Sequence, residues 1–174
     1  MGGIRRDYRM KLGVLSDTHL QTYDKRLERI IAEYFKDVET ILHAGDIVDE
    51  SVLEVFKEKE IIAVCGNMDS TSLKRSMPTK RVIDVAGRRI GLIHGWGNPE
   101  GIEKRVAAEF GDGADCVVFG HTHVPQARVI DGVFFFNPGS PTDRRFTEKN
   151  TIGILEIGEK IGGTILPVDF YRED

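Results

Sequence analysis

The sequence predicts an α/β fold, and three of its features support that prediction. In the first two thirds of the chain, short apolar runs alternate with segments in which apolar residues recur every three or four positions, as in buried strands and amphipathic helices. Turn residues that favour hairpins separate the later apolar runs. The length of 174 residues suits one domain. We therefore expect a single α/β domain over residues 10–174, with two sheets or one large mixed sheet, and residues 1–9 as an N-terminal extension.

The first half of this domain is predicted to alternate strands and helices. The apolar runs at 11–16, 40–46 and 61–67 have the length and composition of buried strands. Between them, helical spacing of apolar residues predicts one helix that starts at Asp24 and a second with Val52, Leu53, Val55 and Phe56 inward and its charges outward. This order implies parallel strands joined by helical crossovers.

The second half is predicted to contain more antiparallel pairs. Two strands are expected around a turn in 81–95, followed by a helix with Asn98 as its N-cap and Pro99 at its first position. A fifth buried strand should occupy 115–121. An Asp-Gly turn marks one hairpin, and a second hairpin completes the antiparallel C-terminal third, over residues 126–137 and 151–170.

Composition and local patterns exclude several classes of protein. The net charge of −4 argues against a general nucleic-acid-binding surface, and no basic stripe with interleaved aromatic residues supports binding of long nucleic acid. The sequence has no membrane-length apolar run and no secretory signal in its first nine residues. We therefore expect a cytoplasmic protein that does not contact membranes. Cys65 and Cys116 lie in apolar runs and are predicted to be buried thiols.

Polar side chains follow five predicted strands, often beside a glycine. Ligands of open α/β sheets gather at the carboxyl ends of strands, so we expect these side chains to converge. Asp17 and His19 should also point to one side of the chain, like His121 and His123, because residues two apart in an extended segment share a face. The candidate metal ligands are Asp17, His19, Asp46, Asn67, His94, His121 and His123.

This set contains two carboxylates, one amide and four imidazoles, and no thiolate. Such donors favour manganese, iron, zinc, nickel or cobalt over magnesium or calcium alone, and we take Mn²⁺ as the expected ion. Seven donors exceed the needs of one catalytic metal with an open position, which predicts two metals that share a carboxylate. Taken singly, each candidate could be a turn, capping or structural residue. His43 is best explained as structural, with a supporting role behind a ligand as the alternative.

The motifs SDTH (16–19), AGD (44–46), GNMD (66–69), IHG (93–95) and GHTH (120–123) occur in an order that resembles the calcineurin-like metallophosphoesterase superfamily. The short chain and NPGS at 137–140 are most similar to its YfcE-type phosphodiesterase branch. The resemblance implies two packed mixed β-sheets flanked by helices, a four-layer sandwich. It also implies the metal roles: one metal held by Asp17, His19 and His123, a second held by Asn67, His94 and His121, and Asp46 bridging the two.

The activity implied by the resemblance is hydrolysis of a small phosphodiester by a hydroxide that bridges the metals, with the Asn67 amide also contacting the phosphate. Many family members have a histidine after this asparagine. The equivalent residue here is Met68, which cannot transfer protons, so diesters or activated esters are favoured. The sequence leaves open whether Asp69 replaces the missing acid.

Two other functions remain open at this stage. One is a non-catalytic protein-binding scaffold that resembles a eukaryotic retromer subunit. The other is a nucleotide-specific phosphodiesterase or nuclease. Pairing of exposed edge strands in the C-terminal hairpins would give a homo-oligomer. We expect a structural turn at NPGS and a solvated loop around Arg144 and Arg145, while Trp96 either borders the cleft or packs in the fold.

Overall fold

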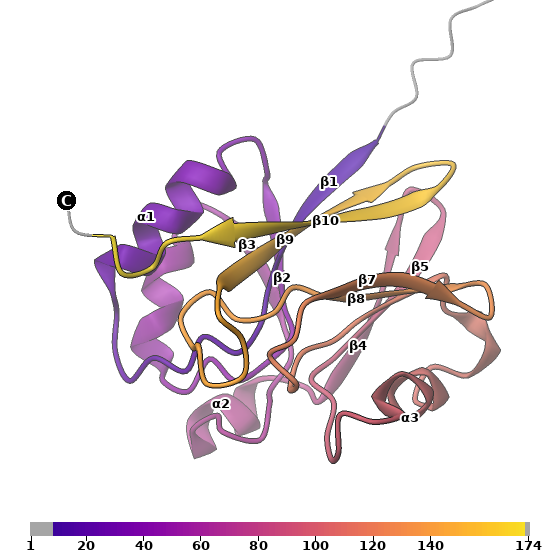
Figure 1. Ribbon diagram of the computed structural model, residues 1–174, viewed down its shortest axis with the longest axis horizontal. Helices are drawn as coiled ribbons and strands as arrows, with labels where there is room; N and C mark the ends of the chain where they lie inside the picture. Colours follow the sequence, from indigo (N-terminus) through magenta and orange to yellow (C-terminus); the bar gives the residue numbers. More distant parts are fainter. Residues whose placement is uncertain (1–8, 173–174) are drawn as a thin grey trace, which may run out of the picture.

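The computed structural model describes residues 9–172 and folds them into two five-stranded sheets with helices outside (Figure 1). Residues 1–8 of the predicted extension lie outside the described residues. Of the two sheet arrangements that the sequence allows, the structure therefore has the two-sheet form. The expected two packed mixed sheets flanked by helices are confirmed.

The first sheet contains the three predicted parallel strands and the last hairpin. β1 (Met10–Leu15), β2 (Thr40–His43) and β3 (Glu60–Ala63) are parallel neighbours. β9 (Asn150–Ile157) is antiparallel to β1, and β10 (Ile161–Val168) is antiparallel to β9. The strand order is β10-β9-β1-β2-β3.

The second sheet has the order β4-β5-β6-β8-β7. Its strands are β4 (Lys80–Val85), β5 (Arg88–Ile93), β6 (Cys116–Val118), β7 (Gln126–Ile130) and β8 (Val133–Asn137). The predicted hairpins β4–β5 and β7–β8 are both present. The expectation that the C-terminal third is antiparallel is wrong at one pair, because β8 returns from the edge hairpin to lie parallel to β6.

The helices confirm one prediction closely and correct two others. α1 (Lys25–Tyr34) is capped by Asp24, whose side chain accepts a hydrogen bond from the backbone N–H of Arg26. η1 (Glu50–Phe56) is a 3₁₀ helix. α3 (Ile102–Ala108) starts after Gly101 rather than at Pro99. Gly101 has a left-handed φ of 70° that interrupts the predicted helix.

Two further details explain these corrections. In η1, the buried Val52 and Val55 are three residues apart, which matches the 3₁₀ repeat. Asn98 accepts a hydrogen bond from Glu100 N–H in a local turn instead of capping α3. The sequence did not predict α2 (Thr71–Ser76), a six-residue helix capped by Ser70, because it has one buried apolar residue and no periodic stripe. A second short 3₁₀ turn, η2 (Gly111–Gly113), precedes β6.

Apolar side chains hold the four layers together. Neighbouring residues of β1 point to opposite faces, since Leu15 packs against α1 and η1 while Val14 packs between the two sheets. Phe136 of β8 lies in the same inter-sheet core, and Val106 of α3 packs against the outer face of the second sheet. Burial on both faces explains why the central strands are continuously apolar. Cys65 and Cys116 are buried free thiols, as predicted.

Candidate metal centre

The candidate site lies where strands of both sheets end. Backbone hydrogen bonds join the loops there: Asp17 N–H donates to Gly45 O at 3.0 Å and His19 N–H to Asp46 O at 3.1 Å. Gly120 N–H donates to His94 O at 3.0 Å within the second sheet. The prediction that the polar strand ends converge is thus supported by direct contacts between the loops that carry them.

Backbone conformation concentrates strain at these residues. Non-glycine residues rarely adopt a positive φ, and strained backbone clusters at functional sites. Eight non-glycine residues in the described part of the chain have a positive φ, and five of them are candidate ligands. These five are Asp17, His19, Asp46, His121 and His123, with φ from 44° to 68°. The extended-chain argument for pairing Asp17 with His19 and His121 with His123 is therefore wrong, because left-handed turns aim these side chains.

Close packing of the loops requires glycine at two positions. A Cβ on Gly120 would lie 1.8 Å from Ser16 Oγ and 2.5 Å from Asp17 Oδ2. A Cβ on Gly66 would lie 2.2 Å from Asp46 Oδ1. Real Cβ atoms essentially never approach other heavy atoms so closely, so these glycines allow the two carboxylates to reach the site.

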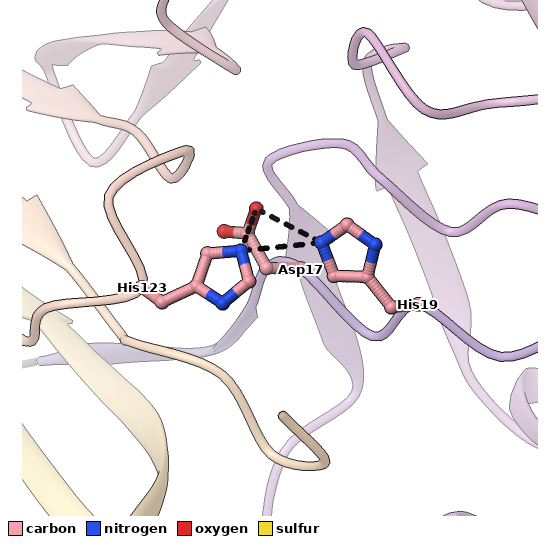
Figure 2. Close-up of side chains that lie close together, drawn as sticks. All are labelled: Asp17, His19 and His123. Carbon is pink, nitrogen blue, oxygen red and sulfur yellow. Dashed lines mark hydrogen bonds and ion pairs between the residues drawn. The ribbon is translucent and has the colours of Figure 1, made fainter. Parts of the chain in front are cut away.

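Three side chains form one compact group (Figure 2). Asp17 Oδ1 lies 3.3 Å from His123 Nε2 and 3.7 Å from His19 Nε2, and the two imidazole nitrogens are 3.2 Å apart. Figure 2 shows all three side chains directed toward one point, with Asp17 between the rings. This convergence matches the three residues that the family resemblance implies for the first metal.

Asp46 lies between this group and His94. Its Oδ2 atom is 3.5 Å from His19 Nε2 and 3.3 Å from His94 Nε2. Its other oxygen, Oδ1, accepts a hydrogen bond of 2.8 Å from Met68 N–H. One oxygen therefore faces imidazoles on both sides, as a bridging carboxylate must, while the other fixes its orientation.

His94 and Asn67 form the second half of the site. The Nδ1 atom of His94 lies 2.7 Å from Ala44 O, and because a carbonyl only accepts, Nδ1 carries the proton. In a neutral ring, Nε2 then presents its lone pair to Asn67 Oδ1 at 3.1 Å and Asp46 Oδ2 at 3.3 Å. The lone pair of His94 Nε2 and the oxygens Asn67 Oδ1 and Asp46 Oδ2 are all acceptors, so either a proton or a metal ion is needed between them.

His121 is adjacent to this half but is not part of either compact group of ligand atoms among the described residues. Its ring lies edge-on to His94, with centroids 5.4 Å apart. His121 Nε2 lies 3.0 Å from Gly97 O and donates to it. Nδ1 is therefore the atom that His121 has free for a metal.

The electrostatics of the site fit a cation. Burial opposes the charge on Asp17, but the nearby imidazoles of His123 and His19 and the charge of His94 outweigh it and hold the pKa of Asp17 far below the usual range. Burial likewise opposes protonation of His94, yet its hydrogen bond to Asp46 and the charges of both carboxylates raise its pKa to about 9. Without a metal, a proton on His94 therefore partly compensates the carboxylates.

One atom of the site gives the most specific test of metal binding. Asp17 Oδ2 accepts hydrogen bonds from Ser16 Oγ at 2.6 Å and from His121 N–H at 3.0 Å. Asp17 Oδ1, in contrast, is buried without any hydrogen-bond partner. A buried carboxylate oxygen without a donor is costly, whereas a divalent cation would satisfy it. The residues present therefore fit divalent metals with mixed nitrogen and oxygen ligands.

Asp69 is a supporting residue whose role the sequence left open. Its Oδ2 accepts hydrogen bonds from Gly66 N–H at 2.7 Å and Asp46 N–H at 3.2 Å, and its Oδ1 accepts from Val48 N–H at 2.6 Å. It therefore ties the loop after β3 to the loop that carries Asp46. Both oxygens are engaged with backbone donors, so Asp69 positions the site and is not placed to act as a general acid.

NPGS has the structural role that the sequence favoured. Asn137 donates from its amide to Gly120 O at 3.0 Å and to Thr122 Oγ1 at 3.1 Å. Ser140 Oγ donates to Asp17 O at 2.7 Å. The loop after β8 therefore braces the two strained segments that carry Asp17 and the GHTH histidines.

Two other polar residues contact the loops or rings of the site. His43 is buried, accepts a hydrogen bond from Gly45 N–H through Nδ1, and contacts Thr18 Oγ1 at 3.4 Å through Nε2. Asp143, which sequence reasoning missed, places a carboxylate oxygen 3.4 Å from His123 Nδ1. This contact does not have the geometry of a hydrogen bond, and His123 Nδ1 has no hydrogen-bond partner among the described residues. Carboxylates behind ligand imidazoles orient such rings.

The remaining candidates lie at the edges of the site. Arg145 is an exposed side chain paired with Asp143, and Arg144 donates to Asn150 and lies over the ring of Tyr171. The solvated-loop interpretation thus holds for Arg145, while Arg144 is held by its neighbours. Trp96 borders a cleft beside His94, the first of the two alternatives for this residue.

Comparisons with known proteins agree with this arrangement. Residues 10–160 match the model of the calcineurin-like phosphoesterase superfamily domain. A probable metallophosphoesterase of Methanothermobacter thermautotrophicus is 35% identical over 160 residues, which cover 90% of this chain and 92% of the relative. The solved structure of an archaeal phosphodiesterase has a TM-score of 0.75 and 28% identity, and the match covers 91% of this chain and all of that one.

The fold and the polar centre define an α/β protein of the metal-dependent hydrolase type. More specifically, the chain belongs to the calcineurin-like phosphoesterase superfamily, whose activity is phosphoester hydrolysis with divalent metals. The structure of vacuolar protein sorting 29 from Cryptosporidium parvum is also similar, with a TM-score of 0.70, 18% identity and coverage of 93% and 99% of the two chains. At that identity the similarity concerns the fold alone. No helix among residues 9–172 is long and apolar enough to span a bilayer.

Proposed function

We propose that this protein is a phosphodiesterase that hydrolyses small phosphodiesters with two divalent metal ions, Mn²⁺ being the expected one. The observation that carries the proposal is the unpaired, buried Asp17 Oδ1 next to the shared oxygen of Asp46, with three imidazole Nε2 atoms around them. The similarity to an archaeal phosphodiesterase supports the choice of diesters. We further propose that residues 10–174 act as one domain.

In this proposal the ligands divide into two sets. Asp17, His19 and His123 hold one ion, and Asn67, His94 and His121 hold the other, with Asp46 shared. When bound, two divalent ions supply an activated water as the nucleophile at neutral pH and Lewis-acid stabilisation of the phosphoryl oxygens. The protein holds their ligands in place through the strained backbone and the hydrogen bonds described above.

The residues around Asn67 suit a diester better than a monoester with a poor leaving group. Asn67 uses Oδ1 toward His94 and keeps its amide nitrogen for a phosphate oxygen. Lys74 Nζ donates to Asn67 O at 2.7 Å and adds positive charge beside that phosphate. Met68 is 57% exposed and provides no acid, and Asp69 is engaged with backbone donors. The leaving group must therefore depart without a strong acid from this loop.

The direct test is hydrolysis of bis(p-nitrophenyl) phosphate by protein loaded with Mn²⁺. We expect Asp46→Asn and His123→Ala to lower turnover by about 10²-fold or more, because each removes a ligand. Asp84→Asn, the same change at an exposed position on β4, is the matched control and should retain wild-type turnover.

The outcome also separates the enzyme from a non-catalytic scaffold. Wild-type turnover by metal-loaded Asp46→Asn or His123→Ala would contradict the ligand assignment. Stoichiometric metal without hydrolysis of any phosphate ester would instead favour a protein-binding scaffold.

A further inference from the structure

A cleft of about 480 Å³ opens directly beside the His94 half of the metal centre. Asn67 and His94 form part of its wall, so the cleft and the candidate site share two residues. This volume falls in the range of small-molecule sites, about 300–1,000 Å³. A group esterified to a phosphate at the metal centre would therefore have room to extend into the cleft.

Trp96 has the largest side chain among the residues that line this cleft. The side chain is 44% exposed, although a tryptophan without a polar partner or ligand usually packs in the interior. It lies between Gly95 and Gly97, which have left-handed φ values of 96° and 77°. These two turns project the side chain from the loop that follows β5.

The loop that carries Trp96 is held at several points. Arg105 of α3 donates to Trp96 O at 3.2 Å, to Glu100 O at 2.9 Å and to Asn98 O. His121 Nε2 donates to the neighbouring Gly97 O at 3.0 Å. The backbone on either side of the indole is thus held in part by a candidate metal ligand. A loop held in this way presents its ring with little loss of entropy on binding.

The rest of the wall suits a planar, largely uncharged group. Ile93, Gly95 and Cys65 line the cleft. Lys80 and Glu109 are paired at 2.7 Å and neutralise each other. The lining is therefore apolar around Trp96, with cationic Lys74 at the end that meets Asn67.

We infer that Trp96 is a specificity-determining residue that stacks against a planar aromatic group of the diester, such as a nucleobase, while the phosphate sits at the metal centre. The inference rests on the proposed function and adds a substrate class to it. Base–aromatic stacking contributes about 10-fold or more in affinity per base.

Trp96 is the single tryptophan of the chain, so emission excited selectively from tryptophan, beyond the absorption of the four tyrosines, reports on this residue alone. The protein is loaded with Zn²⁺, which is diamagnetic, and titrated with adenosine 5′-monophosphate, phenyl phosphate, ribose 5-phosphate and adenosine. We expect the two aromatic phosphates to quench the emission, and adenosine 5′-monophosphate to bind about 10-fold more tightly than ribose 5-phosphate measured by competition. Phenyl phosphate shows whether a simple aryl ring is sufficient, and adenosine should bind weakly because it lacks the phosphate.

Variants extend the test to a second readout. Inhibition constants for adenosine 5′-monophosphate and ribose 5-phosphate are measured against diester hydrolysis. Trp96→Ala should reduce the ratio of the two constants to about 1, whereas Trp96→Phe should retain most of it. Metal content and thermal unfolding are measured for each variant, so that loss of the site is not mistaken for loss of stacking.

The two hypotheses fail in different ways. If adenosine 5′-monophosphate inhibits hydrolysis without quenching Trp96, and Trp96→Ala leaves the ratio unchanged, the stacking inference is overturned and the phosphodiesterase stands. If no phosphate compound binds in a metal-dependent way and no diester is hydrolysed, the proposed function itself is overturned.

Discussion

The backbone contacts of Asp69 lead to the most discriminating mutational prediction. Its two carboxylate oxygens accept three backbone N–H groups, from Gly66, Asp46 and Val48, at 2.6–3.2 Å. In Asp69→Asn the amide oxygen can accept the hydrogen bonds from Gly66 N–H and Asp46 N–H. The amide nitrogen, which is a donor, then faces the donor Val48 N–H and cannot accept its hydrogen bond. One hydrogen bond to a charged acceptor is lost, and two others lose their charge assistance.

The size of the effect follows from these three bonds. A hydrogen bond to a charged group contributes about 1.5–3 kcal/mol, so we expect Asp69→Asn to lower the free energy of unfolding by about 2–4 kcal/mol. For a chain of this length that corresponds to a fall in Tm of about 5–15 °C. Because the same bonds position Asp46, metal affinity should also fall by about 10–100-fold.

The assay combines thermal unfolding with metal titration and a pH profile of hydrolysis. Asp84→Asn, an exposed aspartate on β4, serves as the control and should change neither stability nor metal affinity. A variant with unchanged Tm and metal affinity, but with the acid limb of its kcat profile abolished, would show that Asp69 acts as a general acid and would refute the positioning role.

Two further predictions concern protonation and packing. In the metal-free protein the His94 pKa is raised from 6.5 to about 9, so the stability due to its protonation is fully present below pH 6.5 and is lost as pH rises through about 9. We expect the free energy of unfolding, measured with denaturant, to fall by up to about 3 kcal/mol over this pH window. If His94→Gln shows the same fall with pH, His94 is not its cause. Since a metal must displace this proton, metal binding should release protons and strengthen with pH up to about 9, which calorimetry in buffers of different ionisation enthalpy detects. Gly120→Ala places a Cβ 1.8 Å from Ser16 Oγ and 2.5 Å from Asp17 Oδ2, so the metal affinity should fall by about 10-fold or more. Gly162→Ala, where a Cβ meets nothing within 4 Å, is the control. Equal metal affinities for the two variants would show that the Asp17 loop can move aside.

Local signals predicted most of the fold. The strands were recognisable because the central ones are buried on both faces and hence continuously apolar. The second-sheet hairpins were recognisable because Asp131-Gly132 is a pair that favours left-handed turns, and because Gly87 marks the other turn, where Ala86 also adopts a positive φ. The errors in predicting the helices occurred where local sequence signals conflict or are absent. The start of α3 depends on Gly101 rather than on the Asn98-Pro99 pair, and α2 has no apolar periodicity to reveal it.

The candidate site was predictable in residue type and in place, but not in its geometry. Strand ends bearing Asp, Asn and His indicated which residues converge. That five of them adopt left-handed backbone could not be predicted, because this conformation is imposed by the contacts of Asn137, Ser140 and Asp69 with the loops. Asp69 lies within the GNMD motif, and Asn137 and Ser140 lie within NPGS, but their supporting roles depend on tertiary contacts with loops that are distant in sequence or carried by other strands.

In the proposed site, seven side chains hold two metal ions around the shared oxygen of Asp46. The most direct test of this arrangement is a crystal structure of the Mn²⁺-loaded protein with anomalous scattering measured at the manganese edge. We expect two peaks, both about 2.0–2.3 Å from Asp46 Oδ2, one also bound by Asp17 Oδ1 and His123 Nε2 and the other by His94 Nε2. A single peak, or peaks bound by residues outside this cluster, would contradict the dinuclear site.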